Sequence, residues 1–325
     1  MSSACRICGN ARGNESFVAR EMMFGFGDEF EYFMCSECGC LQISQMPQNL
    51  SKYYPASYYS FSARELPKSN ALTSRVKRLR TLHCLGGKSA IGGVLTVVFG
   101  QLLLPSWVKE GGIDVDSKIL DVGCGAGHLI ARLQTQGFSD LTGVDPYIPA
   151  DRCFGNGIRI FKRELADVDE TFDFIMLHHS FEHVTHSLQM LRTLHEKTRP
   201  GGAVLIRIPV VPSFVWDEYG TDWVQLDAPR HLYLHSLTSM DFAAKRTGFE
   251  IASVEFDSTG FQFWGSEQYR RGIPLEDPRS LRHGTDESVF SHADIEEFER
   301  MSRELNATRR GDQACFILRR EPRSS

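Results

Sequence analysis

The sequence predicts an α/β fold, in which a doubly wound and mostly parallel sheet follows a small N-terminal zinc-binding domain. From about residue 116 onward, short runs of β-branched and apolar residues alternate with helical patterns, and this rhythm is typical of parallel strands joined by helices. Five of the nine cysteines lie within the first 40 residues, and four of these form two CxxC pairs. The two ends of the chain therefore predict two different kinds of structure.

The composition is that of an ordinary globular protein. The chain has 325 residues, 42% of them apolar, and a formal net charge of -5, which allows a full core and excludes a basic nucleic-acid coat. An odd and unevenly spaced set of cysteines argues against a disulfide framework and for a reducing compartment. The N-terminus, MSSACRICGN, has no apolar signal core, so we expect a cytoplasmic protein.

Seven strands and three helices are predicted in the sheet domain. The strands are predicted at 118–123, 140–145, 158–162, 172–177, 203–210, 249–256 and 314–320. The helices are predicted at 127–136, 186–199 and 236–247. We divide the chain into a zinc-binding segment at 1–50, a connecting helical or lid segment at 51–115 and the sheet domain at 116–325. Such sheets bind ligands at the carboxyl ends of their strands, so functional residues are expected there.

Cys5, Cys8, Cys35 and Cys38 are the predicted metal ligands. Each CxxC pair is followed by a glycine, whose positive φ lets the chain turn around a metal. Four thiolates close a tetrahedral site, so a zinc ion held there would support the fold and take no part in chemistry. A redox pair is the alternative, but a redox CxxC would lie near a βαβ unit and would not occur in duplicate.

Residues 90–107 form a stretch of 18 residues without a charge. A membrane span needs about 20 apolar residues, and glycine, proline and glutamine interrupt this stretch, so we expect a buried helix or a lid over an apolar substrate. The residues before it, 64–88, are strongly basic. Peripheral contact with a membrane surface through 75–107 is therefore one interpretation, and a solvated helix face is the other.

A glycine turn, ILDVGCGAGHL, lies between the first predicted strand and the first predicted helix of the sheet domain, and its glycines are Gly123, Gly125 and Gly127. The dinucleotide pattern GxGxxG would require glycine where the chain has His128, which disfavours a pyrophosphate ligand. Asp121 suits an ammonium group, and Asp145, at the end of the second strand, can accept hydrogen bonds from ribose hydroxyls. These residues together describe a ligand with a ribose and a charged amino acid but without a phosphate.

This constellation resembles the class I S-adenosylmethionine-dependent methyltransferases, whose glycine turn has the form DxGxGxG. Two further motifs agree with that family: EHV after the fourth strand, and LHEKTRPGGAVLIRIP over a helix, a PGG turn and the fifth strand. The resemblance implies a Rossmann-like sheet of seven strands whose last strand, 314–320, is inserted antiparallel. It also implies S-adenosylmethionine as the cofactor, held by Asp121, Gly123, Gly125, Gly127 and Asp145, with Glu164 or Leu165 beside the adenine.

A narrower resemblance concerns the bacterial deoxysugar C-methyltransferases. The two CxxC pairs, the stretch YYPASYYS and a histidine before a Tyr-x-x-Ser sequence are similar to features of that family. The resemblance implies that His231 is the general base and that the acceptor is a small molecule, namely a sugar, a nucleotide-sugar or a glycoconjugate. Tyr58 and Tyr59 are candidate substrate contacts or core aromatics. Arg230 stands where the family has glutamate, which leaves transfer to oxygen as an alternative to transfer to carbon.

Further histidines cluster after the fourth strand, in HHSFEHV. A methyl acceptor must lose a proton, and the near-neutral pKa of histidine suits that task, so His178 and His179 are further candidates for the base. The spacing of His179 and His183 also matches the HxxEH pattern of metallopeptidases. That zinc site requires a long helix, whereas these residues follow a strand, so we expect ligand contact or capping by Glu182 and His183 instead.

Two other functions stay open. RNA methylation, with the zinc segment as the recognition element, is one of them. The net charge of -5 and the lack of a PP-aromatic motif after the fourth strand speak against it, so no nucleic-acid partner is expected. A non-catalytic zinc-binding scaffold is the other, and the intact acidic and glycine residues of the predicted cofactor site speak against that.

Overall fold

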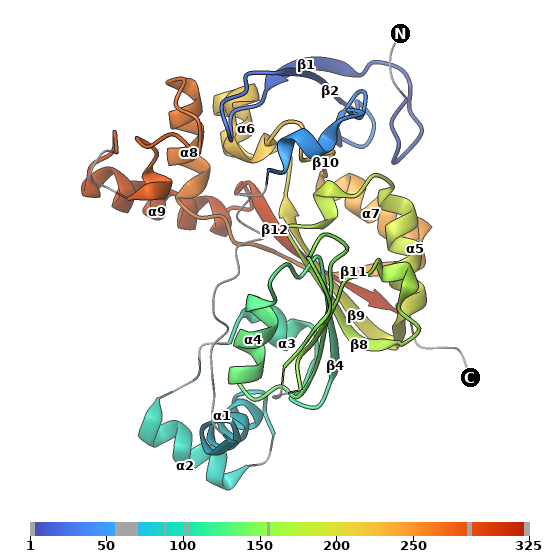
Figure 1. The fold of residues 1–325 in the computed structure, drawn as a ribbon, viewed down its shortest axis with the longest axis vertical. Coiled ribbons are helices and arrows are strands. Elements are labelled where there is room, and N and C mark those ends of the chain that lie inside the picture. Colours follow the sequence, from blue (N-terminus) through green and yellow to red (C-terminus); the bar gives the residue numbers. More distant parts are fainter. Residues whose placement is uncertain are drawn as a thin grey trace.

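The computed structural model describes residues 4–55, 71–87, 89–100, 102, 104–154, 157–284 and 288–321. Within them, a mixed sheet of eight strands forms the centre of the molecule, and an antiparallel sheet of four strands lies at one end (Figure 1). Tyr58 and Tyr59, the candidate substrate contacts, lie outside the described residues.

The central sheet has the strand order β11-β12-β9-β8-β4-β5-β7-β6. Its strands are β4 (Lys118–Val122), β5 (Asp140–Val144), β6 (Arg152–Cys153), β7 (Arg159–Phe161), β8 (Phe172–His178), β9 (Thr198–Pro209), β11 (Phe249–Phe256) and β12 (Gln313–Arg320). β12 runs antiparallel between β9 and β11, as the resemblance implied. All seven predicted strands are therefore confirmed, and the short strand β6 is added at the edge, antiparallel to β7.

Helices cover both faces of the central sheet. Trp107 packs on the face that carries Phe174, and Leu191 packs within the cluster on the face that carries Ile175. Phe174 and Ile175 are successive residues of β8, so their side chains point to opposite faces. The helices concerned are α3 (Ser106–Glu110) and α4 (His128–Thr135) on the first face, and α5 (Ser187–Lys197) and α7 (Leu237–Arg246) on the second. The predicted doubly wound arrangement is confirmed.

The four-stranded sheet joins two distant parts of the chain. Its order is β1-β2-β3-β10, with β1 (Glu15–Arg20), β2 (Glu29–Met34) and β3 (Leu41–Ile43) from the N-terminal segment. The fourth strand, β10 (Tyr233–Leu234), comes from the region after β9 and pairs antiparallel with β3. The N-terminal segment is thus completed by a strand that lies about 190 residues further along the chain than β3. Three helices, α6 (Phe214–Tyr219), α8 (Phe261–Arg270) and α9 (His292–Ala307), lie at the same end of the molecule (Figure 1).

Helices α1 (Ala71–Cys84) and α2 (Ala90–Phe99) form a hairpin at the opposite end of the molecule (Figure 1). They pack closely at Gly92, where a Cβ atom would lie 2.2 Å from the carbonyl oxygen of Leu79. The outer face of α2 is apolar and exposed, and Val97 has 87% of its surface accessible. The expectation of a buried helix within 90–107 is therefore wrong, because apolar composition does not show which side of a helix is covered. No helix among the described residues is long and apolar enough to cross a membrane.

Candidate active site and metal centre

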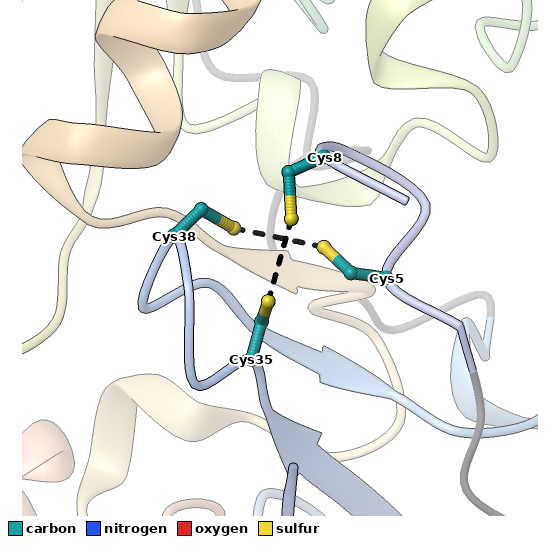
Figure 2. Close-up of side chains that lie close together, drawn as sticks. All are labelled: Cys5, Cys8, Cys35 and Cys38. Atoms are coloured by element: carbon teal, nitrogen blue, oxygen red, sulfur yellow. Dashed lines mark hydrogen bonds between the residues drawn. The ribbon is translucent and has the colours of Figure 1, made fainter. Parts of the chain in front are cut away.

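Four cysteines converge beside the N-terminal sheet, with their sulfur atoms pointing toward one another (Figure 2). Sγ of Cys5 lies 3.6 Å from Sγ of Cys38, and Sγ of Cys8 lies 3.5 Å from Sγ of Cys35. Four Zn–S bonds of about 2.3 Å in a tetrahedron would separate the sulfur atoms by about 3.8 Å, so the observed spacing fits a zinc ion. The hydrogen bond with Cys38 is the main cause that lowers the pKa of Cys5 to about 4, and the side-chain amide of Gln42 contributes. All four predicted ligands are thus brought together.

The glycine turn links the end of β4 to the start of α4. Gly123 has a φ of 75° and Gly127 a φ of 84°, values that residues with a side chain rarely adopt. A Cβ atom on Gly127 would lie 2.2 Å from Cδ1 of Ile160, and one on Gly123 would lie 2.6 Å from Cβ of Ser180. Both positions therefore require glycine, for conformation and for space. Gly125, between them, donates its backbone N–H to Asp145.

Asp121 and Asp145 lie at the carboxyl ends of the neighbouring strands β4 and β5. Oδ2 of Asp145 accepts the N–H of Gly125 at 2.9 Å, and Oδ1 accepts the N–H of Tyr147 at 2.8 Å. Asp121 is buried, and this burial, together with the charge of Asp145, raises the pKa of Asp121 to about 7. An ammonium group beside Asp121 would favour its ionised form, so the arrangement suits the ligand that the sequence predicts.

The residues predicted beside the adenine follow β7. Leu165 is buried at the start of a 3-10 helix (Leu165–Asp167), whereas Glu164, just before it, is exposed. Tyr147 was not predicted from the sequence; it is 76% exposed just after β5 and offers a ring on which a base can stack. The available signal was an aromatic residue two positions after the acid that ends the second strand.

A cavity of about 290 Å³ lies at the same edge of the central sheet. Its lining combines residues from the ends of the strands, from the region between β9 and β10, from the start of α8 and from the N-terminal segment. The polar side chains among them are His179, His183, Arg207, Gln225, Asp227, His231, Thr259, Arg282 and Gln313. None of the lining residues comes from α2, so α2 does not form a lid over this cavity.

His178 is the last residue of β8, whereas His179 follows the strand with a φ of 50°, and the two side chains lie in different surroundings. His178 packs on Trp107, with ring centroids 5.5 Å apart, and burial lowers the pKa of His178 to about 3. His179 lines the cavity, and its Nε2 lies 2.6 Å from a guanidinium nitrogen of Arg207. Of the three histidines predicted as the base, the structure places His179 and His231 on the cavity and His178 away from it.

His231 is held in one tautomer. Its Nδ1 lies 2.7 Å from the carbonyl oxygen of Gln225, and Nδ1 carries the proton because a carbonyl can only accept. Nε2 then has a free lone pair, and it lies 3.9 Å from Oε1 of Glu182 and 3.8 Å from Oδ2 of Asp227. Burial lowers the pKa of His231 to about 4, so the ring is neutral at pH 7. An unprotonated nitrogen beside a cavity can serve as a base or as a metal ligand.

Arg230 ties the N-terminal segment to the cavity. Its buried guanidinium donates to Oε1 of Glu21 at 2.8 Å and to Oδ1 of Asp227 at 2.6 Å. The hydroxyl of Tyr32 donates to the carbonyl oxygen of His231 at 2.9 Å. Glu21 and Asp227 were not predicted from the sequence, because no local pattern connects Glu21 with an arginine that is 209 positions away.

Comparison with known protein families adds to this geometry. Residues 100–254 match the model of a family described as a methyltransferase domain. The chain is therefore similar to this family over somewhat less than half of its length. The strand order, with β12 antiparallel between β9 and β11, is the Rossmann-like fold that the resemblance to the class I methyltransferases implied. The cysteine cluster lies outside the matched residues.

Proteins similar to this chain include two that are named ubiquinone biosynthesis O-methyltransferase. The chain is 30% identical to the one from Azorhizobium caulinodans over 153 residues, which are 42% of this chain and 60% of that protein. It is 29% identical to the one from Pseudomonas syringae over 110 residues, which are 30% of this chain and 47% of that protein. The chain therefore spans about half the length of these two relatives. Among solved structures, an S-adenosylmethionine-dependent methyltransferase from Mesorhizobium loti is 18% identical, with a TM-score of 0.39 and coverage of 63% of this chain and 91% of that one.

Proposed function

We propose that the whole chain is an enzyme that transfers the methyl group of S-adenosylmethionine to a small molecule. The observation that carries this proposal is the position of two sites along one edge of the sheet. Asp121, Asp145 and the glycine turn lie at the ends of β4 and β5, and the cavity of about 290 Å³ lies at the ends of β8 and β9. A cofactor held at the first site would face an acceptor in the second.

The proposed acceptor is a hydroxylated molecule, a sugar or a glycoconjugate, that is methylated on oxygen. The cavity offers Gln225, Thr259 and Gln313 as hydrogen-bonding partners for hydroxyl groups. The relatives named as O-methyltransferases support transfer to oxygen. The small volume of the cavity and the net charge of -5 favour this acceptor over RNA.

The proposed reaction places His231 at the acceptor. The acceptor hydroxyl gives its proton to the group of residues around His231, its oxygen forms a bond to the methyl carbon, and the carbon–sulfur bond of the sulfonium breaks to leave S-adenosylhomocysteine. We assign the activation of that hydroxyl to the group of residues around His231, whose Nε2 has the free lone pair. We propose that the cysteine cluster holds a structural zinc ion and takes no part in methyl transfer.

Replacing His231 by alanine tests this assignment. We expect the rate of methyl transfer to fall about 10²-fold or more, because a positioned group that activates the acceptor contributes on that scale. The measurement is mass spectrometry of one added methyl group, after incubation with S-adenosylmethionine and a panel of nucleotide-sugars and other hydroxylated molecules. His292→Ala is the matched control, because His292 is exposed at the start of α9. Equal rates for the two variants would remove His231 from the active site.

We also propose that the hairpin of α1 and α2 contacts an anionic lipid surface. Residues 71–108 contain no aspartate or glutamate, although the chain as a whole has a net charge of -5. The basic residues of α1 include Arg75 and Lys77. Helix α2 packs against α1 and carries the exposed apolar face. Two such basic hairpins would repel each other, so an anionic membrane fits this surface better than a second copy of the chain.

Sedimentation with lipid vesicles tests this surface. We expect binding to vesicles that contain phosphatidylglycerol and much weaker binding to pure phosphatidylcholine. Val97→Asp should weaken the binding about tenfold or more, because it removes an apolar side chain and adds a repelled charge. Val18→Asp is the matched control, since Val18 is 56% exposed on β1 at the other end of the molecule. A dimer that Val97→Asp dissociates, without vesicle binding, would assign the surface to a second copy instead.

A further inference from the structure

We propose that Glu182, His183 and His231 form a second metal site, which binds a divalent cation such as zinc beside the acceptor cavity. One ligand atom from each of these residues lies within 4.8 Å of the others. The site is separate from the cysteine cluster, and none of its ligands is a cysteine. Its role as a place where the acceptor binds rests on the proposed function, whereas the binding of the cation does not.

The carboxylate of Glu182 is the first observation that points to a cation. Glu182 is completely buried, and neither of its oxygens accepts a hydrogen bond from any described residue. Its nearest charged or ionisable neighbours are Nδ1 of His179 at 3.4 Å and Nε2 of His231 at 3.9 Å. An ionised carboxylate without a partner is costly to bury, so this position needs a cation or a proton to balance it.

The two histidines are oriented as metal ligands usually are. Nδ1 of His183 lies 2.9 Å from the carbonyl oxygen of Arg230, and Nδ1 of His231 lies 2.7 Å from that of Gln225. In both rings the proton is therefore on Nδ1, and Nε2 has the lone pair that a metal requires. Metal-binding histidines characteristically donate their other ring N–H to a carbonyl or carboxylate, which fixes the tautomer and the direction of the ring.

The charges around the site favour a divalent cation. Glu21 and Asp227 share one guanidinium, that of Arg230, and no arginine or lysine among the described residues pairs with Glu182, so three carboxylates have one fixed positive charge between them. Two other arginines line the cavity, and both are already paired: Arg207 with Asp257 at 2.6 Å and Arg282 with Glu276 at 3.0 Å. A single divalent cation bound by Glu182, His183 and His231 would balance the two negative charges that remain.

The open side of the site faces the acceptor cavity, because His183, His231 and Asp227 all line it. Three protein ligands leave at least one coordination position free, which is typical of a catalytic site and not of a structural one. An acceptor oxygen bound at that position would be acidified by the cation, so His231 would act as a ligand and the cation would activate the hydroxyl. The inferred acceptor class is therefore a molecule with a hydroxyl oxygen that can bind a metal.

Metal content measures this site without knowledge of the acceptor. The full chain is incubated with zinc chloride, freed of excess metal by gel filtration and analysed by inductively coupled plasma mass spectrometry. We expect two zinc ions per chain for the wild type and one for Glu182→Gln and for His231→Ala. Calorimetric titration should show that the affinity for the second ion falls by about 100-fold or more in these variants. Mutation of residues that only hydrogen-bond to a metal ligand already lowers metal affinity about 10- to 100-fold. Glu296→Gln and His292→Ala, at exposed positions of α9, should keep both ions.

Two outcomes would overturn the second metal site. One is a wild-type chain that takes up a single zinc ion, and the other is a second ion that survives both Glu182→Gln and His231→Ala. Thermal unfolding of the same samples shows whether the variants are folded. Titration of these samples with S-adenosylmethionine tests the proposed function separately: a chain that binds the cofactor but only one zinc contradicts the second metal site alone.

Discussion

Replacing Arg230 with methionine is expected to lower the free energy of unfolding by about 3–5 kcal/mol, because it breaks a buried group of charges by removing one partner. Arg230 is fully buried and donates to both Glu21 and Asp227. Methionine fills much of the same space but leaves two carboxylates buried without their cation. Because Glu21 belongs to the N-terminal segment and Asp227 lines the cavity, the loss should loosen the contact between them.

Urea denaturation of the wild type and of two variants measures this effect. Arg300→Met is the matched control, because Arg300 forms ion pairs with Glu297 and Glu304 at the surface of α9 and is 50% exposed. Exposed pairs contribute about 0–1 kcal/mol, so this variant should change the free energy of unfolding by no more than that. Equal losses in the two variants would show that the buried charges of Arg230, Glu21 and Asp227 do not stabilise the fold.

Replacing Cys38 with serine is expected to have a larger effect, namely loss of the proposed zinc ion and of the structure built around it. Structural zinc contributes about 10–16 kcal/mol to the folding of small zinc domains. The consequences should reach the cavity, because β3 pairs with β10 and the hydroxyl of Ser236 donates to the carbonyl oxygen of Cys38. We therefore expect the loop that carries His231 to lose order together with the N-terminal sheet.

Hydrogen exchange followed by mass spectrometry locates this loss. Peptides from β1 to β3 and from the region around His231 should exchange much faster in Cys38→Ser than in the wild type. Peptides from β4 and β5 should change little, because these strands lie in the central sheet. Cys153→Ser is the control, since Cys153 is exposed in β6 and outside the cysteine cluster. Unchanged exchange near His231 would mean that the zinc segment does not support the cavity.

The sequence predicts the elements of the sheet well and their long-range partners poorly. Buried parallel strands consist of continuous β-branched and apolar runs, so β4, β5, β8 and β9 could be located from local sequence. The antiparallel insertion of β12 came from a family resemblance, because no local pattern shows where a strand is placed in a sheet. The pairing of β3 with β10 had no signal at all, since β10 consists of only two residues.

The same limit applies to the candidate site. The spacing of Cys5, Cys8, Cys35 and Cys38 identified four side chains that the fold brings together, because CxxC pairs form local loops. For the base, the sequence does not distinguish His178 from His179, whereas the structure places only His179 of the two on the cavity, just after β8 and with a φ of 50°. The pattern HxxEH was not assigned to a peptidase, and Glu182 and His183 indeed lie on a 3-10 helix of three residues. Their neighbour His231 is 48 positions further along the chain than His183, so its contact with them required the structure.

The central claim is that S-adenosylmethionine binds at the ends of β4 and β5, and titration calorimetry with this cofactor tests it most directly. We expect the wild type to bind one equivalent. The pKa of Asp121 is raised to about 7, and the ammonium of the cofactor needs its ionised form, so the affinity should fall about eightfold as the pH is lowered from 7.4 to 6. Asp145→Ala should lose about 100-fold or more in affinity, because two hydrogen bonds to a charged group are removed. Asp140→Ala, which changes a half-exposed residue of β5, should bind as the wild type does. A wild type that releases no heat of binding, or an Asp145→Ala variant with unchanged affinity, would contradict the claim.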